Sequence, residues 1–320
     1  MTANPRVNKQ SNSSKVLPMS SRCWVIGSAV LDTVYSVGRL PQPGENVIAS
    51  KVEQFLGGKG VNQAIACSRS NAETSILLCL GLNDNIGDKF VELLETENLS
   101  DTGVIFTEAV ATGQASVTIA PNGMNTIAIF PGSNMLLPAS LITRSPITED
   151  DYVLCQFEVP NDVIIAASQR GKFILNPAPF RPFPEEILKN CFAITPNETE
   201  AKALTGILPT SDKACQMCCN QLIERGVTHV ILTLGENGVF YQGPKACQRF
   251  PAPKVDAVDT TAAGDVFNGA LIARLSLGDT FEQAIPYSVA AASLSVTKAG
   301  AVPSIPRKQK IENFMSARNS

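Results

Sequence analysis

The stretch 255–275 carries the residues best suited to chemistry. Four small residues, Thr261, Ala262, Ala263 and Gly264, form a turn that leads into a helical pattern of apolar residues. The first N–H groups of such a helix have no partner within it. Together with the positive end of the helix dipole, they form a site for phosphate-like charge. The sequence therefore predicts that this turn stabilises a developing negative charge.

Asp265 lies just inside the start of this predicted helix. A carboxylate beside an anion site should be repelled when a phosphate arrives, so its placement needs a reason. One reason is general-base catalysis, in which it takes a proton from a hydroxyl that attacks a phosphoryl group. The other is structural, since an acidic residue at a helix start is favoured by about 0.3–1 kcal/mol. The residues alone leave both open.

Composition limits the classes of protein. A chain of 320 residues, 44% of them hydrophobic, is long enough for one large α/β domain or two ordinary ones. A net charge of −3 argues against nucleic acid as the main partner. The single histidine, His229, excludes histidine-based triads, and the scattered cysteines are typical of thiols in a reducing cytosol. We therefore expect a cytoplasmic protein.

The N-terminal residues and the hydrophobic runs indicate how the chain is placed in the cell. Residues 1–20 are polar and lack the apolar run of a signal peptide, so we expect a disordered leader. No stretch approaches the roughly 20 apolar residues of a membrane span. We expect no membrane as a partner.

Strands and helices alternate along the chain, which predicts a mostly parallel sheet with both faces covered. The predicted strands are 23–28, 76–80, 152–157, 172–175, 193–194 and 229–234, and the predicted helices are 61–68, 86–97, 161–169, 198–205 and 214–225. Three further stretches alternate in polarity: 47–55, and 115–120 with 126–130, a pair joined by a turn typical of a hairpin.

Two separate stretches resemble the signatures of the ribokinase (PfkB) family of carbohydrate kinases. Residues 259–267, Asp-Thr-Thr-Ala-Ala-Gly-Asp-Val-Phe, resemble its C-terminal signature, and residues 57–64, Gly-Gly-Lys-Gly-Val-Asn-Gln-Ala, resemble its N-terminal one. The resemblance covers about 23–314 and is strongest to members that phosphorylate ribose. It implies a three-layer α/β sandwich over residues 21–320 with a small β-sheet lid. The lid strands are expected at about 35–56 and 113–131.

The resemblance also implies an activity: transfer of the γ-phosphate of ATP to the primary hydroxyl of ribose, with Asp265 as the base. The residues implied for the sugar are Asp32, Gly58, Lys59, Gly60, Asn62, Glu158 and Asp265. Those implied for ATP are Asn197, Thr233, Leu234, Gly235, Glu236, Asn237, Gly238 and Gly264. Read without the family, Thr233–Gly238 is an ordinary glycine turn, and Asn197 with Glu200 is a helix capping box; the capping box and the family role can both hold.

Metal ions and a partner are implied in the same way. Glu200 would organise Mg²⁺ through water. A K⁺ site would be formed by Asp259, Thr261, Ser295, Lys298, Gly300 and Ser304. Lids from two copies could pair to make a homodimer.

One residue departs from the pattern of the ribose-specific members. Two positions before Asp32 they carry an asparagine, and this chain has Val30. The segment 27–32 is closer there to relatives acting on nucleosides or keto-sugars. The alternatives are therefore a nucleoside or other carbohydrate kinase, and a non-catalytic sugar-binding regulator built on the same fold. The intact pair Gly264–Asp265 argues against the regulator.

Overall fold

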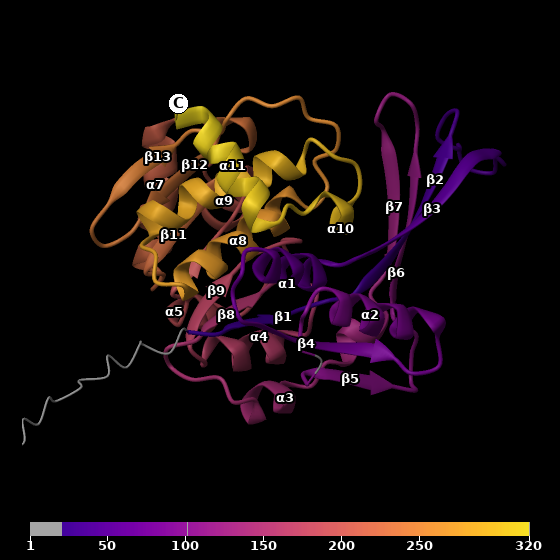
Figure 1. Ribbon diagram of the computed structural model, residues 1–320, viewed down its shortest axis with the longest axis horizontal. Coiled ribbons are helices and arrows are strands. Elements are labelled where there is room, and N and C mark those ends of the chain that lie inside the picture. The colour runs from indigo at the N-terminus through magenta and orange to yellow at the C-terminus, as the bar shows by residue number, and fades with distance from the viewer. Residues whose placement is uncertain (1–20, 101, 320) are drawn as a thin grey trace, which may run out of the picture.

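The fold was analysed in a computed structural model, which describes residues 21–100 and 102–319. These residues form a large α/β body and a smaller sheet that projects from it (Figure 1). The expected leader, residues 1–20, lies outside the described residues. No helix within the described ranges combines the length and the apolar character needed to cross a bilayer.

The body is built on a nine-stranded sheet with the order β13-β12-β11-β10-β9-β8-β1-β4-β5. The strands from β11 to β5 run parallel, and β12 and β13 continue the sheet antiparallel at one edge. The mostly parallel sheet expected from the sequence is confirmed. The strands are β1 Cys23–Ile26, β4 Thr74–Gly81, β5 Val104–Thr107, β8 Tyr152–Cys155, β9 Lys172–Leu175, β10 Ala193–Ile194, β11 His229–Thr233, β12 Val239–Gln242 and β13 Cys247–Phe250.

Helices cover both faces of this sheet because alternate residues of its buried strands belong to different cores. In β1, Val25 packs into one core, and Trp24 and Ile26 pack into the other. The first core is closed by α1 Lys59–Arg69, α2 Asn85–Thr96, α8 Ala263–Ser276, α9 Phe281–Ser295 and α11 Lys308–Asn319. The second is closed by α3 Ala139–Arg144, α4 Asn161–Ser168, α5 Glu186–Lys189, α6 Glu198–Thr205 and α7 Asp212–Glu224. Short turns η1 Gly132–Leu136, η2 Gly235–Asn237 and α10 Ala301–Ser304 complete the body.

The smaller sheet has four strands in the order β3-β2-β6-β7. They are β2 Val30–Val37, β3 Ala49–Gly57, β6 Gly113–Ile119 and β7 Asn125–Phe130. Only three residues separate β1 from β2, so β2 begins at Val30, before the expected range 35–56. Asp32 therefore lies within β2, opposite Phe55 and Ala115.

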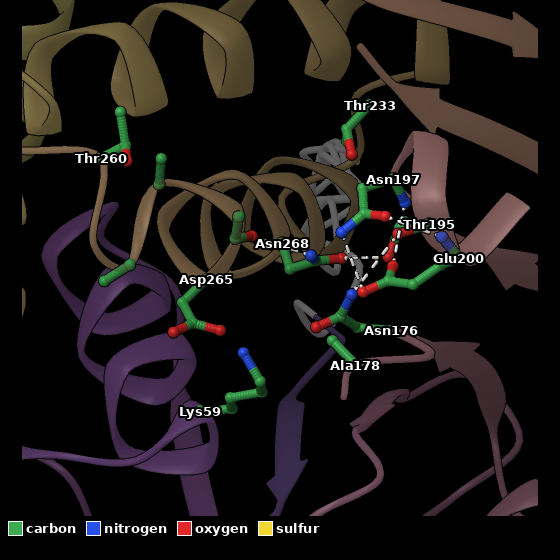
Figure 2. A pocket seen from close by; sticks show the side chains of 13 residues that line it. Lys59, Asn176, Ala178, Thr195, Asn197, Glu200, Thr233, Thr260, Asp265 and Asn268 are labelled. Carbon is green, nitrogen blue, oxygen red and sulfur yellow. Dashed lines mark hydrogen bonds between the residues drawn. The ribbon is translucent and has the colours of Figure 1, made fainter. Parts of the chain in front are cut away.

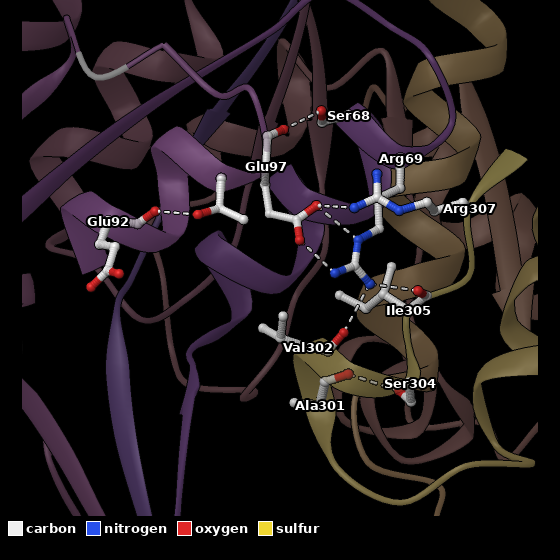
Figure 3. A network of polar contacts seen from close by, with 10 residues as sticks. Ser68, Arg69, Glu92, Glu97, Ala301, Val302, Ser304, Ile305 and Arg307 are labelled. Carbon is white, nitrogen blue, oxygen red and sulfur yellow. Dashed lines mark hydrogen bonds and ion pairs between the residues drawn. The ribbon is translucent and has the colours of Figure 1, made fainter. Parts of the chain in front are cut away.

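An ion-pair cluster fixes the segment after α9 against the end of α1 (Figure 3). The guanidinium of Arg69 donates to both carboxylate oxygens of Glu97, at 2.6 and 2.9 Å. Its remaining N–H groups donate to the carbonyls of Val302 and Ile305. The hydrogen bonds from Arg69 hold the pKa of the Glu97 carboxyl below its usual value. The segment 302–305 therefore has a defined position against the end of α1.

Candidate active site

A cavity of about 230 Å³ lies at the carboxyl edge of the parallel strands (Figure 2). Open α/β sheets usually place their ligands at this edge. The lining comes from α1, from the residues after β9 and β10, from the last residue of β11, and from the start of α8 with the turn before it. The lining residues are Lys59, Asn176, Ala178, Thr195, Asn197, Glu200, Thr233, Thr260, Ala262, Ala263, Gly264, Asp265 and Asn268.

The start of α8 presents unpaired N–H groups to this cavity. Ala262 has φ 62° and ψ 5°, a left-handed conformation that is uncommon for a residue with a side chain, and the helix begins at Ala263. The N–H groups of Gly264 and Asp265 have no carbonyl partner one turn earlier within the helix. A Cβ built on Gly264 would meet nothing within 4 Å, so open space lies directly beside these donors. The turn and helix expected from the sequence are confirmed, with the helix beginning within the four small residues.

Asp265 is held by two amide side chains of α1. Its Oδ2 accepts from Asn62 Nδ2 at 3.0 Å, and its Oδ1 accepts from Gln63 Nε2 at 2.9 Å. The carboxylate is buried, with 5% of the residue exposed. Figure 2 shows Lys59 pointing toward it. The negative charge of Asp265 raises the pKa of Lys59, so the ammonium stays charged despite its burial.

Asn197 and Glu200 meet at the start of α6 as a capping box. Asn197 Oδ1 accepts from the Glu200 N–H at 2.8 Å, and the Glu200 carboxylate accepts from the Asn197 N–H at 2.9 Å. Burial raises the pKa of Glu200. The capping interpretation is thus confirmed, and both residues also line the cavity. Thr233 lines it as well, whereas Leu234 is buried and η2 with Gly238 lies outside the lining.

A second group of polar residues lies where the body meets the small sheet. The Glu158 carboxylate accepts hydrogen bonds from the Ser28 hydroxyl and, at 3.1 Å, from the Lys59 N–H. Burial raises the pKa of Asp32 to about 6, and the charge of Glu158 adds to this shift. Asn62 Oδ1 is buried and receives no hydrogen bond from any described residue. This group holds acceptors that suit the hydroxyls of a sugar.

The glycines of the N-terminal signature are required by close packing at this junction. A Cβ on Gly60 would lie 2.3 Å from the Ser28 nitrogen, and Gly58 has φ 91° with backbone atoms of 28–30 within about 3 Å of its Cβ position. These glycines therefore let α1 begin against the strand that leads into the small sheet, which brings Lys59 and Asn62 to the site.

The two segments expected to form a cation loop are adjacent. Asp259 Oδ1 accepts from the Thr261 N–H and Oδ2 from the Gly300 N–H, both at 2.9 Å. Burial alone would raise the pKa of Asp259, but these hydrogen bonds hold it below its usual value. The hydroxyls of Ser295 and Ser304 donate to carbonyls within their own helices. Among the described residues no cluster of three or more His, Cys, Asp or Glu could hold a metal ion.

Several residues of the site were missed in the sequence. They are Gln63, Thr260, Asn176, Ala178, Thr195 and Asn268 in and behind the cavity, and Ser28 beside Glu158. Asn176 and Thr195 directly follow the buried strands β9 and β10. A polar residue immediately after a buried parallel strand was the signal that could have found them.

A buried carboxylate lies beside a helix N-terminus at the carboxyl edge of a parallel sheet, an arrangement that suits phosphoryl transfer in an α/β protein. The chain belongs to the pfkB family of carbohydrate kinases, whose model matches residues 20–308. It is therefore an ATP-dependent carbohydrate kinase, as the sequence signatures implied.

Individual relatives match along nearly the whole chain. The ribokinase of Staphylococcus aureus (strain COL) is 36% identical over 302 residues, which cover 92% of this chain and 99% of the relative. The crystal structure of a Thermotoga maritima ribokinase matches with a TM-score of 0.86 and 37% identity, covering 92% and 99% of the two chains. An Arabidopsis thaliana ribokinase complexed with ribose and ATP matches with a TM-score of 0.85 and 28% identity, covering 93% and 99%. The expected three-layer fold is confirmed.

Proposed function

We propose that this kinase transfers the γ-phosphate of ATP to the primary hydroxyl of ribose. The proposal is supported by relatives named ribokinase that match nearly the whole chain, one of them complexed with ribose and ATP. The observation that carries it is the position of Asp265. Its carboxylate lies at the start of α8, lines the cavity and is hydrogen-bonded to Asn62, the residue that connects it to the polar group around Asp32.

Asp265 would act as the general base. With the sugar held by Asp32, Asn62 and Glu158, its carboxylate takes the proton as the hydroxyl oxygen attacks the γ-phosphorus. The bond from that phosphorus to the bridging oxygen of ADP breaks in line. The N–H groups at the start of α8 stabilise the charge that develops on the phosphoryl oxygens. Gly58 and Gly60 would contribute by close backbone approach to the sugar, and Lys59 by neutralising phosphate charge.

The nucleotide would occupy the cavity and extend toward η2. Asn197 and Thr233 line the cavity, and Leu234–Gly238 directly follow Thr233 in the chain, outside the lining. Glu200 fits a role in holding Mg²⁺ through water, because Mg²⁺ keeps several waters and needs only one or two carboxylates beside the substrate phosphates. When bound, Mg²⁺ offsets negative charge on the phosphates.

A K⁺ site between the segments around Asp259 and Gly300 would act on the anion turn without touching substrate. The supporting observation is that the Asp259 carboxylate is bonded to the N–H of Thr261, the first residue of that turn. Carbonyl oxygens and one carboxylate suit a hard, weakly held cation. Ser295, Lys298 and Ser304 complete the proposed loop pair. Activity should fall when K⁺ is replaced by a bulky organic cation, and Asp259→Ala should remove that response.

The small sheet would act as a lid that excludes water, which otherwise competes with the sugar as acceptor. Its strands leave large apolar side chains exposed, including Val52, Ile127 and Ile129. A second copy of this chain would cover them, which supports a homodimer through the lid. Eight buried free cysteines and the exposed Cys247 support a reducing, cytoplasmic location.

The test is a phosphorylation screen with the purified chain. ADP release is measured with ATP and a panel of pentoses, hexoses and nucleosides, and the product is analysed by NMR. We expect ribose to give the highest kcat/KM and the product to carry phosphate on the primary hydroxyl. Preference for a nucleoside or another sugar would overturn the ribose assignment. If no compound in the panel led to ADP release, the proposal as a whole would be overturned.

A further inference from the structure

A chain of buried amide side chains lies behind Asp265. Gln63 is fully buried, and its Nε2 donates to Asp265 Oδ1 at 2.9 Å and to Asn176 Oδ1 at 3.0 Å. Its Oε1 accepts from Gln156 Nε2 at 2.5 Å. Gln156 is also fully buried and directly follows β8. Both residues lie outside the cavity lining, so their polar groups serve other side chains.

The orientation of each amide follows from the partners that can only accept. The carbonyl of Thr195 accepts from Asn176 Nδ2, at 3.4 Å, which leaves Asn176 Oδ1 turned toward Gln63. The ionised Asp265 carboxylate also accepts only. Gln63 must therefore present its NH₂ group to both. Its Oε1 then faces Gln156, which must donate a hydrogen bond to it through its NH₂ group.

Gln156 takes this orientation although it leaves its own oxygen without a partner. No described residue donates to Gln156 Oε1, a buried atom. Such an orphaned acceptor is unfavourable and calls for an explanation. Turning Gln156 over would set its oxygen against Gln63 Oε1. If Gln63 turned as well, its oxygen would face Asp265 Oδ1 and Asn176 Oδ1. The observed arrangement is the one that keeps a donor on the Asp265 carboxylate.

The backbone around Gln156 makes room for this arrangement. A Cβ built on Gly27 would lie 2.3 Å from Gln156 Oε1 and 2.6 Å from the Cα of Gly60. Gly27, at the end of β1, therefore leaves the space that the Gln156 amide occupies beside α1.

We propose that Gln63 is a positioning residue for the base Asp265, and that Gln156 acts through Gln63. Gln63 holds Asp265 Oδ1 and so fixes which lone pairs of the carboxylate face the sugar hydroxyl. Gln156 fixes the orientation of Gln63. Neither residue touches substrate. This inference rests on the proposed function, in which Asp265 takes the proton.

The test is a double-mutant cycle with Gln63→Met and Gln156→Met, which keep side-chain length but remove the amides. We measure kcat, the KM values for ribose and ATP, and Tm for each single variant and for the double variant. Misplacement of a catalytic group typically costs up to about 10²-fold, so Gln63→Met should lower kcat by about 10- to 100-fold with little change in either KM. Gln156→Met should lower kcat less.

The double variant separates a positioning role from a merely structural one. If Gln156 acts through Gln63, the double variant should have the kcat of Gln63→Met alone. If the kcat losses of the two single variants multiply in the double variant, Gln156 does not act through Gln63. If KM rises by as large a factor as kcat falls, Gln63 is not a positioning residue. If Gln63→Met does not fold, Gln156→Met alone still decides: a folded variant with wild-type kcat would refute the inference.

A matched control lies at the other end of the same strand. Asp151 directly precedes β8, is buried, and accepts hydrogen bonds from Trp24 and from the Arg22 N–H. Asp151→Asn should lower Tm while leaving kcat unchanged. Asp265→Asn distinguishes failure of the proposed function from failure of the positioning role of the two glutamines. Full activity in Asp265→Asn would defeat the proposed function itself, whereas loss in Asp265→Asn with wild-type kcat in both glutamine variants would defeat only this inference.

Discussion

The two halves of the proposed site, one for phosphate and one for sugar, are built in different ways. The phosphate half is part of the body, where Asp265 is buried and both of its carboxylate oxygens accept hydrogen bonds from amides. The sugar half is completed by the small sheet, whose strand β7 is exposed along all of its residues. Ile127 and Ile129 on this strand are 55% and 61% exposed. The phosphate half is therefore buried, whereas the small sheet beside the sugar half leaves one strand exposed.

This difference follows from what each half has to do. Stabilising the charge of phosphoryl transfer requires donors and a base that are already in place, because reorganising them during the reaction would add to the barrier. The sugar has to enter and its product has to leave, so that half needs an opening. Asp32 itself is partly buried within this half, and burial, with the charge of Glu158, raises the pKa of its carboxyl to about 6.

Asp265→Asn should give the largest loss, because it removes the base from the preformed half while keeping size and polarity. We expect kcat to fall by about 10²–10⁴-fold. ATP binding, measured by calorimetry, should be retained. Near-normal turnover in a folded Asp265→Asn protein would show that the proton leaves by another route.

Gly264→Ala tests the open space beside the α8 donors. A Cβ there meets no atom within 4 Å, so the protein should fold, but the methyl group would enter the place of the phosphoryl oxygens. Losing preorganised donors of this kind typically costs about 10²–10³-fold in kcat. Gly38, at the end of β2, likewise has nothing within 4 Å of its Cβ position, and Gly38→Ala is the matched control. If Gly264→Ala and Gly38→Ala had the same kcat, the turn before α8 would not be the anion site.

Val30→Asn tests selection in the open half. Val30 is buried at the start of β2, two residues before Asp32. A buried hydroxyl without a partner costs roughly 1–3 kcal/mol, so an asparagine here should lower the KM for ribose by about 5- to 150-fold. If the true substrate places an apolar base there, the same change should raise its KM. Thr33→Asn, on the opposite face of β2, is the control. Unchanged kinetics on ribose and on nucleosides would mean that Val30 does not face the pocket.

The pH dependence of sugar use should report Asp32. Its pKa is raised to about 6, so the carboxylate becomes protonated, and a poorer acceptor for a hydroxyl, as the pH falls through this value. We expect kcat/KM for ribose to decline below it, about tenfold per pH unit, while the KM for ATP stays level. Glu158→Gln removes a charge that raises this pKa and should move the decline to lower pH. A decline that does not move would assign it to another group.

Ile129→Ser should have the smallest effect and tests whether the small sheet is open in the isolated chain. Exposed substitutions usually change the free energy of unfolding by less than about 0.5 kcal/mol. Leu271→Ala, in the buried face of α8, should cost about 2–5 kcal/mol. Denaturant unfolding of both variants checks the contrast. A loss of several kcal/mol in Ile129→Ser would show that this side chain is covered, as pairing of two lids requires.

The sequence alone determined the parallel sheet of the body and the turn and helix start that carry Asp265. The alternation of apolar runs and helical periods predicted the parallel sheet because both signals are local, set by the repeat of two residues in strands and 3.6 in helices. The turn before Asp265 was readable for the same reason: its small residues and the helix that follows are neighbours in the chain. So was the capping box of Asn197 and Glu200, whose members are three residues apart.

Tertiary structure decided what depends on distant residues. The lid was expected to begin at about residue 35 rather than at Val30, because only three residues separate β1 from β2 and the sequence does not mark which sheet each strand joins. Gln63, Asn176 and Gln156 are ordinary polar residues in the sequence, and the spacing of the bonded pairs, up to 113 positions, obeys no local period. Only the packing of α1 against the ends of β8 and β9 turns them toward Asp265. Burial then fixes their orientation, because an amide removed from water must form its hydrogen bonds with partners within the fold.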